Sequence, residues 1–196
     1  MARKATRRQL VGGGIALAAA SAFSRVADAA ASRPAESEAQ VLERVLGIEL
    51  LVVTAYQHVL ATRLLEPAVR TQLNVLLRQE LEHVAMLRAT LERMGAAGPP
   101  APSVLAAQAE LTRHHVYWSL TRLRHQRSAL KLLVDVESLA ENAYFRAIAK
   151  LRDPQLVRTS AEVMGCEAQH WTVLSGLLHH EDPTKAVPYP FVGGSL

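Results

Sequence analysis

The sequence predicts an all-α protein, a four-helix bundle with a long crossover between its second and third helices. Three observations lead to this prediction. Apolar residues recur at spacings of three and four along four long stretches, as they do on one face of an α-helix. The apolar–polar alternation of strands is hard to find. A Glu-x-x-His phrase occurs twice, once in the second stretch and once in the fourth.

The ends of the helices follow from caps and breakers. The four helices are expected at about 38–65, 67–94, 128–151 and 154–178. Ser37 is a candidate N-cap for the first helix, and Pro67 suits the first turn of the second. The connection over 96–127 can run the length of the bundle, so that the third helix starts at the other end. Part of it, from Ser103 to about 124, looks helical, and no residue marks where the third helix begins.

The N-terminus is predicted to be a twin-arginine signal peptide over residues 1–29, followed by a flexible lead-in at 30–37. Arg7 and Arg8 precede an apolar run at 10–23, and small residues after it offer a cleavage site. The run is shorter than the about 20 residues that span a bilayer. Export by the twin-arginine machinery to the periplasm, cell envelope or extracellular space is favoured, and an uncleaved tether is the alternative.

The charge balance argues against nucleic acid as a partner. The chain has 22 basic and 18 acidic side chains, of which residues 1–29 hold five and one. The remainder therefore has 17 of each, and its net charge is near zero. Cys166 is the only cysteine, so no internal disulfide can form, and a small packed residue is the favoured interpretation of it.

Each Glu-x-x-His phrase places a carboxylate and an imidazole on one helix face, because residues three apart share a face. The first and third helices each add one glutamate in the middle of an apolar stripe. The inward set is thus Glu49, Glu80, His83, Glu137, Glu167 and His170. No arginine lies near the middle of these stripes, so the buried carboxylates would be unpaired unless they bind metal.

This set suits two metal ions held in the core of a bundle. Glu80 and Glu167 are expected to bridge the ions, while Glu49 with His83, and Glu137 with His170, complete the two positions. The donors are rich in oxygen, which favours two iron ions, with manganese as the alternative. Open positions would admit dioxygen or peroxide.

Three nearby residues have more than one interpretation. Glu141 could be a seventh ligand, a carboxylate that swings in during turnover, a hydrogen-bond acceptor beside the ligands, or a partly exposed end of its stripe. Tyr56 and Tyr144 each follow a lone glutamate at the same spacing. They are interpreted as core aromatics that hydrogen-bond near the ligands rather than as redox tyrosines.

These residues resemble those of the ferritin-like superfamily of di-iron carboxylate proteins over about 38–178. The phrase from Gly165 to His170 and the stretch from Val136 to Tyr144 look like an exported bacterial branch that includes desiccation-related proteins. The resemblance implies an up-down pair, a crossover and a second up-down pair. It also implies ligand roles for the same six residues. A proline-rich tail at 179–196 makes a large storage shell doubtful, and a homodimer fits because relatives often pair.

The resemblance does not select one activity, because relatives store iron, reduce peroxide or dismutate it. The first hypothesis is an exported di-metal protein that oxidises Fe(II) or reacts with dioxygen or peroxide, as a ferroxidase, peroxidase or catalase would. The alternative is a non-catalytic metal-binding or envelope-protective protein, active in stress or desiccation. A structural bundle without metal is a third hypothesis.

Overall fold

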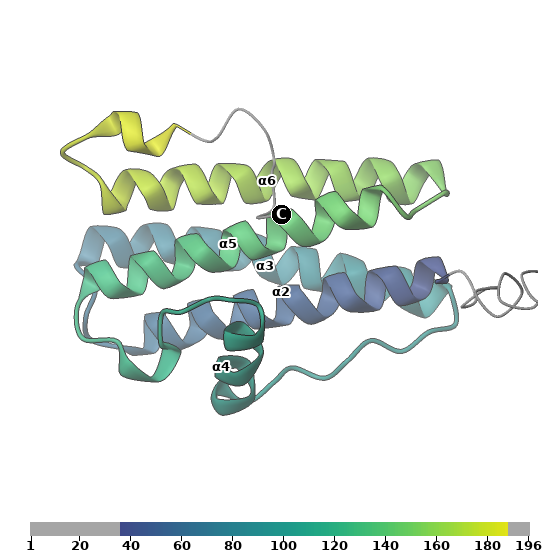
Figure 1. Cartoon of the computed structure of the whole chain (residues 1–196), viewed down its shortest axis with the longest axis horizontal. Coiled ribbons are helices and arrows are strands. Elements are labelled where there is room, and N and C mark those ends of the chain that lie inside the picture. The colour runs from purple at the N-terminus through teal and green to yellow at the C-terminus, as the bar shows by residue number, and fades with distance from the viewer. Residues whose placement is uncertain (1–35, 188–196) are drawn as a thin grey trace, which may run out of the picture. The chain divides into compact units, whose positions relative to one another are not determined.

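The computed structural model describes residues 36–187, and within this range it contains helices and no strand (Figure 1). The predicted all-α bundle is confirmed. Its helices are α2 (Glu38–Ala61), α3 (Pro67–Arg93), α4 (Val104–Arg113), α5 (Gln126–Ile148) and α6 (Pro154–Leu178), with 3₁₀ turns at Leu120–Arg122 and Pro183–Ala186. The predicted signal peptide, nearly all of the lead-in and the tail from 188 onward lie outside the described residues.

The crossover determines the direction of the second helix pair. The backbone N–H of Glu66, at the start of α3, donates to Gln126 Oε1 at the start of α5, 2.7 Å away. At the other end, Glu38 Oε1 accepts from the N–H groups of Arg152 (2.7 Å) and Asp153 (2.8 Å). Therefore α5 runs parallel to α3, and the second pair runs down and up rather than up and down. Figure 1 shows the connection after α3 returning along the bundle before α5 begins.

Three helix boundaries differ from the prediction, two of them because of caps that periodicity does not show. The first helix ends at Ala61 rather than 65, since the Arg70 guanidinium donates to the carbonyls of Leu60 and Thr62 and satisfies the last turn. The third predicted helix, α5, begins at Gln126 rather than 128, since the side chain of His125, the N-cap of α5, accepts a hydrogen bond from Ser128 N (3.1 Å). It also ends earlier, at Ile148 rather than 151. The predicted cap of α2, Ser37, is confirmed.

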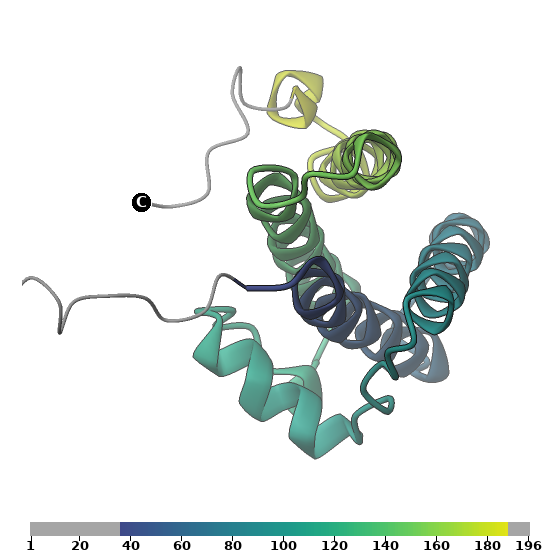
Figure 2. The same cartoon turned by 90° about the vertical axis from the view of Figure 1, so that its right-hand side faces the viewer.

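The crossover helix covers the outer face of α2. Ser103 caps α4, and Ala107 and Leu111 of α4 are fully buried. With α3 and α5 on its other sides, α2 is enclosed, so that even consecutive residues such as Leu51 and Val52 are buried. This explains why α2 is apolar enough to span a membrane by length and composition, although 61% of its most apolar window is buried inside the protein. Figure 2 shows α4 beside α2 at the lower side of the bundle.

The proline-rich composition of the tail predicts an extended segment across the bundle surface, with Tyr189 and Phe191 as apolar anchors, but the beginning of the tail has another form. Asp182 accepts from Thr184 N and caps the short turn Pro183–Ala186, which packs against α6. Tyr189 and Phe191, expected to anchor the tail, lie outside the described residues. The described tail is therefore a compact turn at the end of α6.

Two glycines provide a test of the packing around α2. Gly47 lies within α2 with no atom near an added Cβ, so Gly47→Ala should raise the free energy of unfolding by about 0.5–1 kcal/mol. A Cβ at Gly98 would collide with the buried side chain of Leu46, so Gly98→Ala should lower it by about 1–3 kcal/mol. Urea denaturation measures both changes. Equal effects of the two substitutions would contradict this packing.

Candidate metal centre

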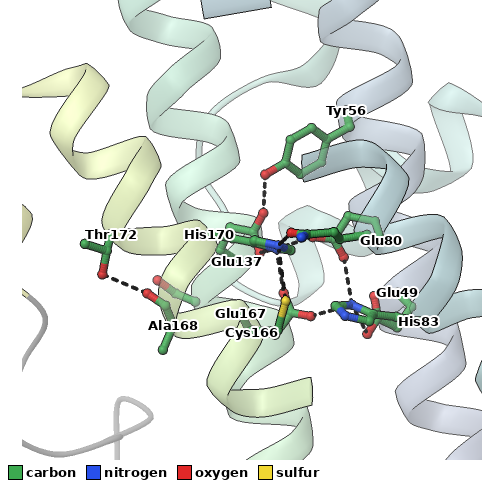
Figure 3. A network of polar contacts seen from close by, with 12 residues as sticks. Glu49, Tyr56, Glu80, His83, Glu137, Cys166, Glu167, Ala168, His170 and Thr172 are labelled. Atoms are coloured by element: carbon green, nitrogen blue, oxygen red, sulfur yellow. Dashed lines mark hydrogen bonds and ion pairs between the residues drawn. The ribbon is translucent and has the colours of Figure 1, made fainter. Parts of the chain in front are cut away.

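Six side chains from four helices converge in the middle of the bundle (Figure 3). The structure brings together every residue of the inward set predicted from the sequence. Its members are Glu49 of α2, Glu80 and His83 of α3, Glu137 of α5, and Glu167 and His170 of α6. The four carboxylate residues are 0% exposed, His170 is 1% exposed and His83 is 9% exposed. The site is thus largely enclosed by apolar helix packing, and His83 is the most exposed of its six residues.

The six side chains form two overlapping groups that could each hold a metal ion. One group is Glu49, Glu80, His83 and Glu167, and the other is Glu80, Glu137, Glu167 and His170. In each group the candidate ligand atoms lie within 4.8 Å of one another. Glu80 and Glu167 belong to both groups, which is the arrangement that two bridging carboxylates require.

Both imidazoles turn Nδ1 toward the carboxylates. His83 Nδ1 lies 2.9 Å from Glu167 Oε1, 3.4 Å from Glu80 Oε2 and 3.7 Å from Glu49 Oε1. His170 Nδ1 lies 2.5 Å from Glu80 Oε1, with Glu137 at 3.6 Å and Glu167 at 3.7 Å. Each ring nitrogen therefore faces three carboxylates from different directions, as one cation would.

Burial makes this concentration of acidic groups costly. It raises the pKa of Glu49 and of Glu137, and the neighbouring carboxylates raise them further. Burial alone would lower the pKa of His83, but hydrogen bonds to Cys166, Glu167 and Glu80 outweigh it and raise this pKa to about 12. In the metal-free protein, protons on the imidazoles thus supply positive charge that stabilises the carboxylates. A bound metal ion would supply that charge at the same place.

The polar atoms of the cluster are not satisfied by the protein alone. Apart from the contacts between the imidazoles and the carboxylates themselves, no hydrogen-bond partner in the described residues reaches either oxygen of Glu80 and Glu167 or the Nδ1 atoms of His83 and His170. Unsatisfied buried acceptors of this kind are rare in native cores and call for a cation or an ordered ligand. The donor set, four carboxylates and two imidazoles, fits two divalent ions.

Two tyrosines hold the outer carboxylates, and each does so across the bundle. The hydroxyl of Tyr56 on α2 donates to Glu137 Oε1 on α5. The hydroxyl of Tyr144 on α5 donates to Glu49 Oε1 on α2, at 2.5 Å. Burial, and then the facing carboxylates, raise the pKa of both hydroxyls, so both keep their protons and donate. This agrees with their interpretation as hydrogen-bonding core aromatics.

Two residues beside the site were missed as site residues by sequence reasoning. Gln79 Oε1 lies 2.7 Å from His170 Nε2, and Cys166 Sγ lies 3.4 Å from the same nitrogen. Cys166 is half-buried, and hydrogen bonds to His170 and then His83 lower its pKa to about 7. It is therefore a polar neighbour of both imidazoles and more than a packed small residue. The only available signal is position, since each residue immediately precedes the glutamate of a Glu-x-x-His phrase.

Glu141 lies close to the cluster but outside both groups of metal-capable side chains. It is half-buried, and burial raises its pKa, with the charge of Glu167 as a smaller cause. Its possible roles as a seventh ligand, a carboxylate that swings in, a hydrogen-bond acceptor or a partly exposed end of its stripe therefore stay predictions.

The sequence places the chain in a family of such bundles. The family of ferritin-like domains matches residues 37–180, which include all four bundle helices and the whole cluster. This chain belongs to the ferritin-like domain family. Its ferritin-like fold is shared by the hypothetical protein MJ0754 from Methanococcus jannaschii, whose crystal structure matches with a TM-score of 0.60 and 16% identity. That match covers 76% of this chain and 85% of the archaeal one. No curated protein matches the chain.

The tyrosine contacts of this ferritin-like domain can be tested without metal. Tyr56→Phe and Tyr144→Phe each remove a donor from a buried carboxylate, so each should lower the free energy of unfolding of the metal-free protein by about 1–3 kcal/mol. Tyr117→Phe is the control, because Tyr117 is 82% exposed. Chemical denaturation in the presence of a chelator measures the three variants. Losses no larger than that of the control would show that these hydroxyls do not support the cluster.

Proposed function

We propose that this ferritin-like protein binds two iron ions in a carboxylate-bridged centre, with manganese as the alternative metal. One observation carries the proposal. Two overlapping groups of fully or nearly fully buried ligand residues share two carboxylates, and most of their ligand atoms have no hydrogen-bond partner outside the cluster. A core that needed only apolar packing would not retain four buried carboxylates at one point.

The overlap of the groups supports a role for each residue. Glu80 and Glu167 would bridge the two ions, since they alone belong to both groups. Glu49 and His83 would complete one position, and Glu137 and His170 the other. Carboxylate oxygens outnumber imidazole nitrogens, which favours iron or manganese over a structural zinc ion.

We further propose that the protein oxidises Fe(II) with dioxygen or peroxide. The six ligand residues would hold two Fe(II) ions, and these would supply one electron each for the reduction of one hydrogen peroxide and two protons to two waters. The protein excludes bulk water from this reaction by burying all four carboxylates. Tyr56 and Tyr144 fix Glu137 and Glu49 by hydrogen bonds, and small reactants would enter near His83, the only ligand residue with appreciable exposure.

Metal binding without turnover is the alternative, including a protective role in the cell envelope during stress or desiccation. The enclosure of the site favours it, since five of the six candidate ligand residues are at most 1% exposed. A rate measurement separates the two functions, because both require the metal but only one requires access for an oxidant.

Metal content and Fe(II) oxidation test the proposal together. Elemental mass spectrometry of the purified protein should find about two iron or manganese ions per chain. The protein should also oxidise added Fe(II) and consume peroxide, and Glu80→Ala with Glu167→Ala should abolish both the bound metal and these rates. Glu82→Ala is the matched control, because Glu82 lies on the same helix but is exposed. If the wild-type protein binds two metal ions but oxidises Fe(II) and consumes peroxide no faster than the double variant, the proposed catalytic function is wrong and the metal-binding function remains.

Export is a separate proposal that rests on the sequence of residues 1–29. If the twin-arginine machinery recognises Arg7 and Arg8, Arg7→Lys with Arg8→Lys should reduce the exported fraction at least about tenfold while the total amount persists inside the cell. Cell fractionation followed by immunoblotting measures this. Arg44→Lys, at an exposed position within the bundle, is the control. Unchanged export of the double variant would exclude this route.

A further inference from the structure

The residues that precede the two Glu-x-x-His phrases lie in corresponding places. Gln79 stands directly before Glu80, and Cys166 directly before Glu167. Each lies near the histidine of the other phrase. Gln79 contacts His170, whereas Cys166 contacts the histidine of its own phrase and lies near enough to His83 to share in the pKa shifts of both groups. These contacts connect α3 with α6 beside the cluster. At His170 they lie on the side of the ring that faces away from the carboxylates, and we call such a contact a brace.

Gln79 can decide which nitrogen of His170 is free to bind a metal. An amide oxygen only accepts hydrogen bonds, so its 2.7 Å contact requires a proton on His170 Nε2. In a neutral ring this leaves the lone pair on Nδ1, which faces Glu80, Glu137 and Glu167. Gln79 thus prepares His170 as a ligand.

His83 has a weaker brace. No amide oxygen contacts its ring among the described residues; the Cys166 thiol lies near it, and sulfur is a poorer hydrogen-bond acceptor than an amide oxygen. The same sulfur also lies 3.4 Å from His170 Nε2, so it is shared between the two rings. Figure 3 shows Cys166 beside Glu167, below His170 and to one side of His83 in this view. The two imidazoles are therefore held unequally, although the residues that would bind metal are duplicated.

The exposure of the two histidines differs in the same direction as their bracing. The side chain of His83 is 11% exposed, whereas that of His170 is 2% exposed. An ion at the His83 position would lie nearer to solvent and would have a less constrained ligand. Both differences favour loss of the ion from that position.

We propose that Gln79 and Cys166 are positioning residues that make the two metal positions unequal. The position completed by Glu137 and His170 binds its ion tightly, and the position completed by Glu49 and His83 binds its ion weakly and exchanges it. This inference rests on the proposed di-metal centre. It assigns the exchanging position, through which a metal substrate would enter, to the His83 side.

Titration with Mn(II), followed by the electron paramagnetic resonance signal of the free ion, tests this inequality. The wild-type protein should show one tight and one weak class of site. Gln79→Leu should weaken the tight class about 10–100-fold and leave the weak class unchanged. Gln79→Glu, which keeps an acceptor, should restore the tight class. Cys166→Ala should weaken both classes, because the thiol contacts both rings.

Gln72→Leu is the matched control, since Gln72 is an exposed glutamine on the same helix without a contact to the ligands in the described part of the chain. Gln79 is itself exposed, so water can replace its amide beside His170 Nε2, and Gln79→Leu should change the melting temperature of the metal-free protein less than Tyr56→Phe or Tyr144→Phe does. Two equal classes in the wild type, or a Gln79→Leu effect that is absent or equal for both classes, would overturn the inference. Fewer than two bound ions in the wild type would instead contradict the proposed di-metal centre.

Discussion

The structure depends on the burial of four carboxylates at one point of an apolar core. An unpaired buried charge costs far more than a side chain's packing can return. Here no arginine or lysine reaches the cluster among the recorded contacts of the described residues, so two imidazoles and two tyrosine hydroxyls supply all of the compensation. Eight buried atoms of the six clustered side chains have no hydrogen-bond partner outside the cluster, so the arrangement suits cations and would be a poor way to stabilise a bundle.

The long crossover is a condition of this site and more than a connection. On α2 and on α5 a glutamate and a tyrosine are separated by the same interval, about two helical turns. Since the crossover makes α5 antiparallel to α2, the tyrosine of each helix lies opposite the glutamate of the other. A short connection would have made α5 parallel to α2, and Tyr144 would then lie far from Glu49. The path of a segment outside the cluster therefore fixes the reciprocal contacts within it.

The six clustered residues could be predicted because a glutamate on an apolar stripe is visible in the sequence itself. What could not be predicted depends on contacts between segments. Arg70 ends α2 from the following helix, and His125 starts α5 with a side chain that periodicity ignores. Gln79 was missed because its position is exposed, so the pattern assigns it to solvent. Cys166 was expected to pack as a small apolar residue, and only the approach of α3 to α6 shows its contacts with the imidazoles.

The approach of α3 to α6 also explains how an enclosed site can exchange ions. The other neighbouring pairs, α2 with α3, α2 with α5 and α5 with α6, pack extensively, whereas α3 and α6 meet only lightly. His83 of α3 is the most exposed of the six clustered residues, and Gln79 of α3 contacts His170 of α6. Tight packing there would close the site, and no bracing would leave the imidazoles free to turn. A hydrogen-bonded brace of one amide and one thiol meets both demands, because it orients the rings without filling the space beside them.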